Sequence, residues 1–350
     1  MDITFLAPCK DLSGGIKVIA TYANLLMDRG HTVTVVYPKN HQPVLRQMKR
    51  WVIKTIKNQN DHLDTFRGRL LAVDQINDES VPTGDIVIAT AWETAEWARD
   101  LSDDKGRKFY FVQGHEVWNG QQERVYATLK LPLTKITISS WLQKLLSEIS
   151  ENHQIELIPN GCDFMLNESQ ALTSDRLYDV GMTYSPIPNK GADIGLGALE
   201  QLAQENPQLK FVIFGSELPE GNLPPNLEIF VKPSRKKIEQ IYRETKVWMS
   251  SSYEEGFCLP CLEAMSCGSV VVSTDNKGVR DMIEDGQSGY ITTPGQISEL
   301  AGRVNFLLKH PDSLSRMQAR SFQKSSEFSW EQSADMFNQL LSSVNSKLAA

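Results

Sequence analysis

The chain has 350 residues, with a hydrophobic content of 41% and a charged content of 23%, which is the balance of a folded globular protein. This length exceeds one ordinary hydrophobic core and suits two domains. A formal net charge of −7 argues against a nucleic-acid-binding protein. No apolar run is long enough to span a bilayer. Five cysteines without framework spacing, together with an N-terminus unlike a signal peptide, predict a cytoplasmic location.

The negative charge is concentrated in the second half of the chain. Residues 1–160 hold 19 basic and 19 acidic side chains, so the remaining 17 basic and 24 acidic ones carry the whole net charge. An acidic half repels a phosphate ligand unless local groups override the repulsion. Specific phosphate-binding groups are therefore expected there.

Strands and helices alternate along the first half. The apolar segment 2–7 predicts a strand, followed by a glycine loop at residues 13–15 and a helix from about Ile16 to Arg29 with one apolar face. Gly30 ends this helix, and residues 32–37 predict the next strand. Further strands are predicted at 85–90, 108–112, 135–139 and 155–159. Short apolar runs between helices are typical of a buried parallel sheet.

The second half repeats this pattern. Residues 177–182, 210–215, 246–251 and 269–274 predict strands, and helices are expected to begin near Lys190, Arg235, Leu259 and Ile297. The turn at residues 159–161 marks a boundary between the halves. The chain is therefore predicted to form two doubly wound α/β domains, with ligand sites at the carboxyl ends of the strands.

The segment 253–268 combines several features that suit a phosphate-containing ligand. A predicted strand runs into a loop with Glu255, Pro260 lies where a first helical turn accepts it, and Glu263 lies one turn inside the helix. The N–H groups at a helix start bind phosphate, and carboxylates accept hydrogen bonds from hydroxyls. A phosphate flanked by two polyols describes a nucleotide sugar.

Glu255 and Glu263 enclose seven residues, and this segment resembles the E-x7-E signature of retaining glycosyltransferases of family 4, in glycosyltransferase group 1. Other segments resemble the same family, in the same order along the chain: the Gly14-Gly15 loop, I-P-N-G-C-D at 158–163, N-K-G-A-D at 189–193, G-S-V-V-V-S-T at 268–274, I-E-D-G-Q-S-G-Y-I at 283–291 and S-W-E at 329–331. The resemblance covers nearly the whole chain.

The resemblance implies a GT-B fold, with two Rossmann-like domains facing each other across a cleft. It implies an N-terminal acceptor domain at 1–163, a nucleotide-sugar donor domain at 164–327 and a C-terminal helix at 328–350 that crosses back. The implied reaction moves a hexose, with UDP-glucose as the expected donor, to a glycan or lipid-linked glycan in polysaccharide biosynthesis. Front-face transfer with retention needs no cofactor or metal here, and the sequence contains no Asp-x-Asp motif.

The resemblance also implies the roles of individual residues in the donor domain. Glu255 would hold hydroxyls of the donor sugar, and Glu263 those of the ribose. The backbone of four loop residues would face the sugar and pyrophosphate: Gly256, Phe257, Cys258 and Leu259. Lys190 would neutralise the leaving diphosphate, and the loop at Lys232 and Pro233 would contact the base.

The N-terminal domain contributes three residues in this interpretation. Gly14 and Gly15 would approach the phosphate from the opposite domain, where a side chain would block the backbone. His115, after a predicted strand, would lie beside the reacting sugar. The predicted catalytic residues are therefore His115, Lys190 and Glu255.

One position departs from the family pattern. The family commonly places an arginine a few residues before the lysine of the Lys-Gly pair, but this chain has Met182 there and a longer loop. Either Lys190 acts with backbone groups and hydroxyls such as Ser185, or another residue supplies the charge. An alternative function is a catalytically silent protein that binds a nucleotide sugar as a scaffold in polysaccharide assembly. A third interpretation, an NAD-dependent Rossmann enzyme, is disfavoured because the fingerprint glycines are missing.

Cys258 and Cys261 form a C-x-x-C pair, which could indicate a redox or zinc site. A set of four metal ligands cannot be found nearby, and both cysteines fall inside the donor segment. They are interpreted as small residues that pack a crowded loop. No metal site is predicted.

Residues 44–57 form a basic amphipathic segment, and no acidic residue occurs between Arg29 and Asp61. Four basic residues share one helical face: Arg46, Arg50, Lys54 and Lys57. Such a helix can bind an anionic membrane surface weakly and in a salt-sensitive way. The alternative is a core-facing helix with a solvated basic side. A peripheral position on the inner face of the plasma membrane is thus one hypothesis.

Overall fold

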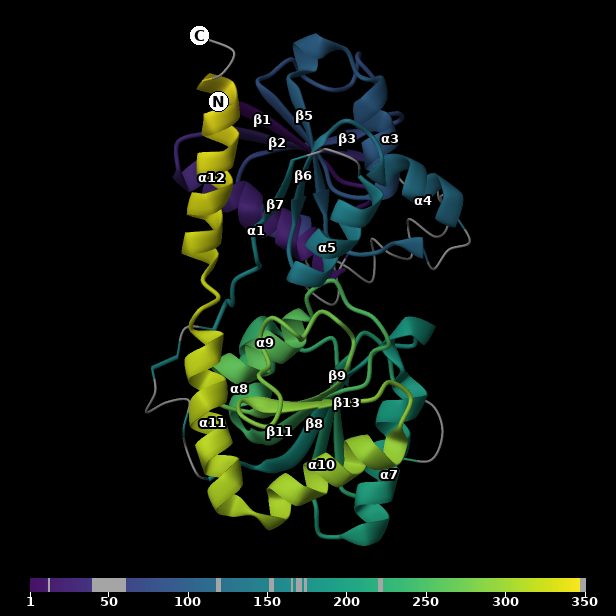
Figure 1. Cartoon of the computed structure of the whole chain (residues 1–350), viewed down its shortest axis with the longest axis vertical. Helices are drawn as coiled ribbons and strands as arrows, with labels where there is room; N and C mark the ends of the chain where they lie inside the picture. Colours follow the sequence, from purple (N-terminus) through teal and green to yellow (C-terminus); the bar gives the residue numbers. More distant parts are fainter. Residues whose placement is uncertain are drawn as a thin grey trace. The chain divides into compact units, whose positions relative to one another are not determined.

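The structure is a computed structural model that describes residues 1–11, 13–39, 61–117, 121–150, 154–164, 166–167, 172, 175–219 and 223–346. It divides into two compact units. The N-terminal unit comprises Met1–Pro159 and Glu331–Ala350, and the C-terminal unit comprises Asn160–Trp330. Figure 1 shows the elements of each unit in sequence colours.

The N-terminal unit is built on a seven-stranded sheet with the order β3-β2-β1-β4-β5-β6-β7, in which all neighbouring strands are parallel. Its strands are β1 (Asp2–Leu6), β2 (Thr32–Pro38), β3 (Arg69–Val73), β4 (Ile86–Ala89), β5 (Arg107–Val112), β6 (Thr134–Thr137) and β7 (Ile155–Leu157). Its α-helices are α1 (Gly14–Asp28), α3 (Trp92–Asp100), α4 (Gln122–Leu129), α5 (Ser140–Ile149) and most of α12 (Trp330–Ser346).

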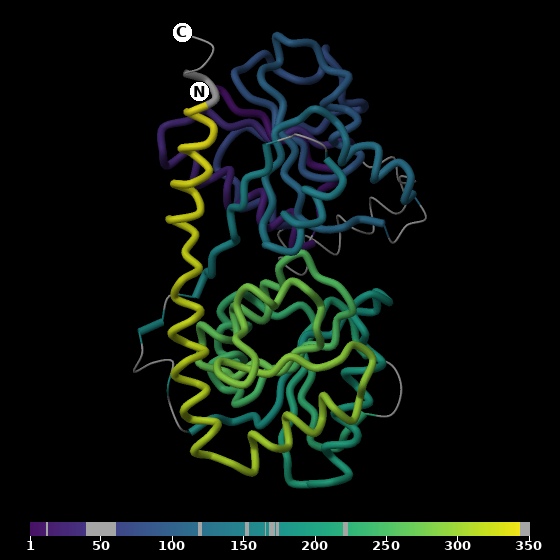
Figure 2. The backbone as a smooth tube through the Cα atoms, in the orientation of Figure 1, coloured from purple at the N-terminus to yellow at the C-terminus, as the bar shows by residue number. Residues whose placement is uncertain are grey.

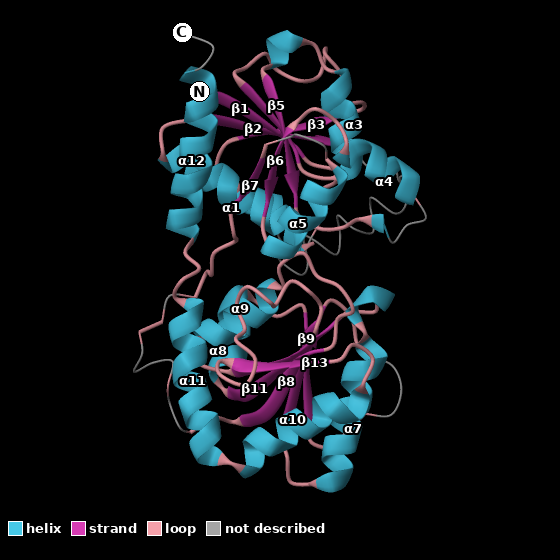
Figure 3. Cartoon of the chain, viewed as in Figure 1, coloured by secondary structure: helices cyan, strands magenta, loops and turns pink. Residues whose placement is uncertain are grey.

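Helices cover both faces of this sheet (Figure 3). One face packs against α3, α4 and α5 through a buried apolar cluster. On the other face the rings of Phe5, Tyr22 and Phe111 surround Phe337 of α12, with centroids 4.9 to 6.5 Å from it. The C-terminal helix is thus part of the N-terminal core, so β1 and α12, purple and yellow in Figure 2, belong to one unit.

The C-terminal unit has a six-stranded parallel sheet with the order β10-β9-β8-β11-β12-β13. Its strands are β8 (Tyr178–Tyr184), β9 (Phe211–Gly215), β10 (Leu227–Val231), β11 (Thr245–Ser250), β12 (Val270–Thr274) and β13 (Gly289–Thr292). Its α-helices are α7 (Ala192–Glu205), α8 (Arg235–Arg243), α9 (Leu259–Ser266), α10 (Ile297–Lys309) and α11 (Pro311–Ser325).

Two apolar layers hold the C-terminal unit together. One face of its sheet packs against α7, α10 and α11, and Met182 is buried in this layer. The opposite face carries Trp248 and Phe214, whose rings contact Tyr242 of α8 at centroid distances of 4.6 and 5.6 Å. Position 182 is therefore a core position, and the missing arginine is replaced there by a packing residue.

The two α/β units with parallel sheets confirm the predicted fold class. Every predicted strand is present, but three further strands, β3, β10 and β13, were not predicted. Helix α1 begins at Gly14, two residues before the predicted start. Residues 44–57 lie outside the described residues, so their membrane association stays a prediction. Among the residues that the structure describes, no helix has the length and apolarity needed to cross a membrane.

Candidate functional site

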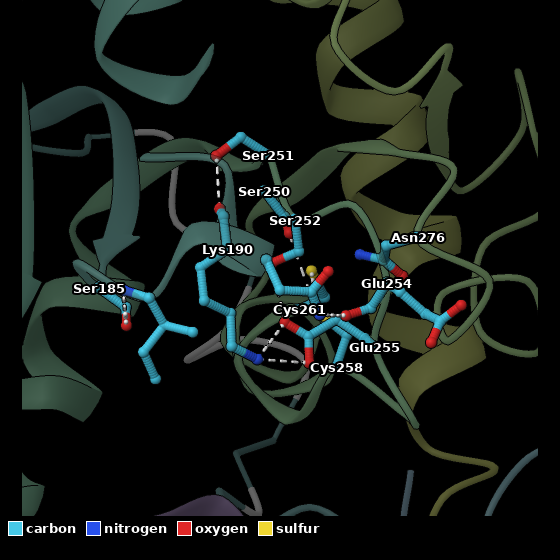
Figure 4. A network of polar contacts seen from close by, with 12 residues as sticks. Ser185, Lys190, Ser250, Ser251, Ser252, Glu254, Glu255, Cys258, Cys261 and Asn276 are labelled. Atoms are coloured by element: carbon cyan, nitrogen blue, oxygen red, sulfur yellow. Dashed lines mark hydrogen bonds and ion pairs between the residues drawn. The ribbon is translucent and has the colours of Figure 1, made fainter. Parts of the chain in front are cut away.

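The predicted donor residues gather at the carboxyl edge of the C-terminal sheet. The loop after β8 carries Lys190, and the loop after β11 carries Glu255. The Lys190 Nζ donates to both carboxylate oxygens of Glu255, at 2.8 Å each. Figure 4 shows the Lys190 side chain extended toward Glu255, whereas the Glu254 carboxylate points to the other side. Two residues that are 65 positions apart therefore form one ion pair at the predicted site.

Hydrogen bonds to backbone carbonyls fix the two loops against each other. The Asn189 side chain donates to the Glu254 carbonyl at 2.9 Å, and the Tyr253 N–H donates to the Asn189 carbonyl at 2.9 Å. The Ser251 hydroxyl donates to the Lys190 carbonyl at 3.2 Å. The Lys190–Glu255 pair thus lies on a rigid frame, which limits the entropy lost when a ligand binds.

Glu255 is held by two further contacts, one to its carboxylate and one through its backbone. The Ser252 hydroxyl donates to its Oε1 at 2.8 Å, and the Glu255 N–H donates to the Asn276 carbonyl at 2.9 Å. The loop after β12 approaches so closely that a Cβ on Gly278 would lie 2.8 Å from the Glu255 carbonyl oxygen. The glycine at 278 is therefore required by packing. Sequence reasoning missed Ser252, Asn276 and Gly278, because their contacts become visible only once β11 and β12 are paired.

Burial acts to lower the pKa of Lys190, but the Glu255 carboxylate more than offsets this effect and the net pKa is raised. Lys190 therefore carries its positive charge at neutral pH. Its ammonium group has three N–H donors, of which Glu255 takes two. The pair thus sets an ammonium group, which can donate to an anionic ligand, beside a carboxylate, a group that accepts hydrogen bonds from hydroxyls.

Helix α9 begins directly after this loop. Its N-cap is Cys258, with a left-handed φ of 66°, and Pro260 lies in its first turn. The first N–H groups of a helix lack intrahelical partners and attract anions. The Cys258 and Cys261 sulfur atoms lie 3.1 Å apart and both side chains are buried. Within the described residues, no group of three or more His, Cys, Asp or Glu side chains could hold a metal ion.

Glu263 lies on α9 and is only 5% exposed. Arg235 at the start of α8 donates to its Oε1 at 3.0 Å, and the Tyr242 hydroxyl donates to its Oε2 at 3.2 Å. Arg235 follows the loop of Lys232 and Pro233, in which Lys232 has a left-handed φ of 49°. The structure therefore brings the predicted ribose-binding carboxylate beside α8, the helix that follows the predicted base-binding loop. No pattern in the sequence predicts Arg235 or Tyr242 as partners of Glu263.

The three predicted residues of the N-terminal unit lie at the carboxyl edge of its own sheet. Gly14 and Gly15 open α1 after β1, and His115 follows β5. The His115 ring contacts Tyr126 edge-on at a centroid distance of 5.7 Å. The adjacent Glu116 accepts the Trp92 N–H at the start of α3, at 2.9 Å. Sequence reasoning missed Glu116, although it is adjacent to His115 in the chain.

Residues 181–324 match the family Glycosyl transferases group 1, a span that contains Lys190, Pro233, Glu255 and Glu263. This finding supports the glycosyltransferase group 1 family, of GT-B type. Among curated proteins, a D-inositol 3-phosphate glycosyltransferase of Rhodococcus erythropolis is 25% identical over 164 residues, which are 42% of this chain and 37% of that protein. A glycosyltransferase of Methanocaldococcus jannaschii is 23% identical over 56% of this chain and 55% of that protein. The aligned segments thus span between about a third and about half of these relatives.

Solved structures show the same fold over almost the full chain. Sucrose-phosphate synthase of Thermosynechococcus elongatus covers 99% of this chain with all of its own, at a TM-score of 0.74 and 15% identity. The Anabaena protein HepE, in complex with UDP-glucose, covers 98% of this chain with all of its own, at a TM-score of 0.75 and 17% identity. The two units are therefore Rossmann-like α/β domains, and the chain resembles glycosyltransferases of GT-B type in fold.

Proposed function

We propose that this chain transfers a hexose from a UDP-sugar, with UDP-glucose as the first candidate, to a glycan or lipid-linked glycan acceptor with retention of configuration. The observation that carries the proposal is the Lys190–Glu255 ion pair, at 2.8 Å, in the loop that leads into α9. This loop lies inside the segment that matches the glycosyltransferase group 1 family. The HepE structure with UDP-glucose, which has the same fold, supports the choice of donor.

The arrangement suggests how the donor is held. Glu255 accepts hydroxyls of the sugar, while the third N–H of Lys190 and the first N–H groups of α9 bind the diphosphate. Glu263 accepts ribose hydroxyls, and the loop at Lys232 and Pro233 contacts the base. Gly14, Gly15 and His115 act from the N-terminal unit on the phosphate and the reacting sugar.

In this mechanism the bond between the anomeric carbon and the diphosphate oxygen breaks while the acceptor oxygen bonds to the same face of the sugar. The acceptor proton passes to the departing diphosphate. The protein positions the reactants and stabilises the negative charge that develops on the leaving group. Lys190 supplies a fixed positive charge for this purpose, so a metal ion is not needed. Activity is expected to persist after treatment with EDTA, and strict dependence on added magnesium or manganese would contradict this step.

The decisive experiment begins with a thermal-shift panel of UDP-, ADP- and GDP-sugars on the purified chain, because a donor that binds the folded state raises the melting temperature. The stabilising donor is then tested for nucleotide release with and without glycan acceptors, and NMR of the product gives the anomeric configuration. Stabilisation with turnover and retention supports the proposal. Stabilisation by a donor without any turnover, across a broad acceptor panel, would instead indicate the scaffold function. Inversion at the anomeric carbon would refute retention.

A further inference from the structure

A charged network surrounds Glu263 in the C-terminal unit. The Arg235 guanidinium donates to Glu263 Oε1 at 3.0 Å and to Asp163 Oδ2 at 2.6 Å. Its planar group also lies over the Phe164 ring, 3.8 Å from the ring centroid. Arg235 is thus held by two carboxylates and one aromatic face, a geometry that suits a guanidinium and not an ammonium group.

Asp163, near the start of the C-terminal unit in sequence, is anchored to the last residues of that unit. Its Oδ1 accepts the indole N–H of Trp330 at 2.6 Å. The Cys162 N–H donates to the Phe328 carbonyl at 3.1 Å, and a Cβ on Gly161 would lie 2.1 Å from the Trp330 nitrogen. The first and last segments of the unit are therefore packed backbone to backbone. This packing fixes the carboxylate that orients Arg235.

The network fixes the Glu263 carboxylate in one orientation, because Arg235 holds one of its oxygens and the Tyr242 hydroxyl holds the other. An isolated carboxylate at 5% exposure would be costly to keep ionised, and a paired cation removes much of that cost. Burial acts to lower the pKa of Arg235, but Glu263 and Asp163 outweigh it and the net pKa is raised. The cation therefore stays charged beside Glu263.

We propose that Arg235 is a positioning residue for ribose recognition, which fixes the orientation of the Glu263 carboxylate so that the site selects a ribonucleotide over a deoxyribonucleotide. This inference rests on the proposed function, which assigns Glu263 to the ribose hydroxyls. Arg235 acts through Glu263, and Asp163 acts through Arg235. The order of effects is therefore fixed: replacing Arg235 weakens discrimination more than replacing Asp163.

The test compares the affinities of UDP, 2′-deoxy-UDP and 3′-deoxy-UDP by calorimetry. Hydrogen bonds to a charged group are each worth about 10- to 100-fold in affinity, so the full chain is expected to prefer UDP by about tenfold or more. In Arg235→Met this preference is expected to fall toward one, and Arg235→Lys is expected to restore it in part. Asp163→Asn is expected to give an intermediate preference. The matched control is Arg243→Met, on the same helix, where the arginine contacts Glu239 at 3.8 Å.

The ratio of affinities separates this role from a merely structural one. A folded Arg235→Met variant that keeps the full preference for UDP would overturn the proposal, even if all three nucleotides bind more weakly. If Arg235→Met does not fold, Asp163→Asn takes its place in the test. A folded Asp163→Asn variant that keeps the full preference for UDP would then overturn the proposal. Equal binding of all three nucleotides by the unaltered chain would also overturn it. Failure of the unaltered chain to bind any nucleotide would refute the proposed function itself.

Discussion

The two units share one strand order, yet their carboxyl edges are built differently. In the C-terminal unit each predicted carboxylate is paired with a cation, Glu255 with Lys190 and Glu263 with Arg235. At the corresponding edge of the N-terminal unit, Glu116 takes a backbone N–H of α3 instead. The edge of the C-terminal sheet therefore has fixed charges before a ligand arrives. The edge of the N-terminal sheet has a glycine turn at the start of α1 and a histidine after β5.

This difference predicts that changes at the C-terminal edge act on donor binding, whereas changes at the N-terminal edge act on turnover. The largest effect is expected for Glu255→Ala. The variant loses the carboxylate that orients the sugar and leaves the Lys190 amine without its partner at 2.8 Å. Transfer is expected to fall by about 10²-fold or more in kcat/KM for the donor, as measured by nucleotide release over a range of donor concentrations.

The neighbouring residue provides a matched control for this variant. Glu254 is also a half-buried carboxylate, but it pairs with Lys277 and not with Lys190. Glu254→Ala is expected to retain most of the activity. A folded Glu255→Ala variant with near-normal turnover, or equal losses in the two variants, would remove Glu255 from the proposed role.

A second pair of variants tests the division between the units. Lys190→Ala is expected to weaken UDP and UDP-sugar together by roughly 10-fold or more, because the phosphate loses a charge-assisted donor and meets an unpaired Glu255. His115→Ala is expected to lower kcat more than UDP affinity, since UDP carries no sugar for it to contact. Calorimetry with UDP and steady-state rates give the two quantities. If both variants change UDP affinity and kcat in the same proportion, the two units do not act separately on donor binding and turnover.

Much of the fold could be predicted from the sequence because buried parallel strands consist of short runs of apolar residues. The three strands that were missed, β3, β10 and β13, all lie at sheet edges. Edge strands are only half covered, so β10 reads Leu-Glu-Ile-Phe-Val with an exposed acid, and β13 begins with glycine. Such sequences do not stand out from loops.

The residues by themselves predicted the candidate site only where they are close in sequence, and distant members such as Lys190 were added by the family resemblance. Glu255 and Glu263 lie in one loop and the helix that follows it, so the sequence predicts their spacing directly. The partners of these carboxylates come from other elements, with Arg235 28 positions from Glu263. Such pairs depend on how α8 and α9 pack, which periodicity does not encode. Position 182 illustrates the same limit, because only the structure shows that its side chain lies in the core.

A smaller effect is expected at Gly15, in the first turn of α1. A Cβ there would lie 3.6 Å from the Gln113 side chain, which is an ordinary contact. Gly15→Ala should therefore leave the fold intact, and can stabilise the helix by up to about 1 kcal/mol. If the backbone approaches a phosphate, the added methyl group should still lower activity by about tenfold. A helical control is Gly302→Ala, where a Cβ meets nothing within 4 Å. Full activity in Gly15→Ala would argue against the phosphate contact.

The smallest expected effect concerns Glu116 and the stability of the N-terminal unit. Burial raises the pKa of Glu116 from 4.5 to about 7, the Trp92 N–H opposes this shift and Glu93 adds to it. Between these two values the folded unit keeps a proton that the unfolded chain has released. The free energy of unfolding therefore falls as pH rises through this window, and the loss is complete above pH 7. The loss in the free energy of unfolding over this window is at most about 3 kcal/mol.

Glu116→Gln removes the titration while its amide oxygen can still accept the Trp92 N–H. The variant is therefore expected to be more stable than the unaltered chain by roughly 1–3 kcal/mol at pH 8, with the difference shrinking to near zero at pH 4.5. Calorimetric unfolding across this range measures it, with Glu123→Gln, at an exposed position of α4, as the control. An advantage that does not vary with pH would mean that the change acts through packing and not through the proton. A variant that is less stable at pH 8 would show that the charged carboxylate strengthens its bond to α3 by more than burial costs.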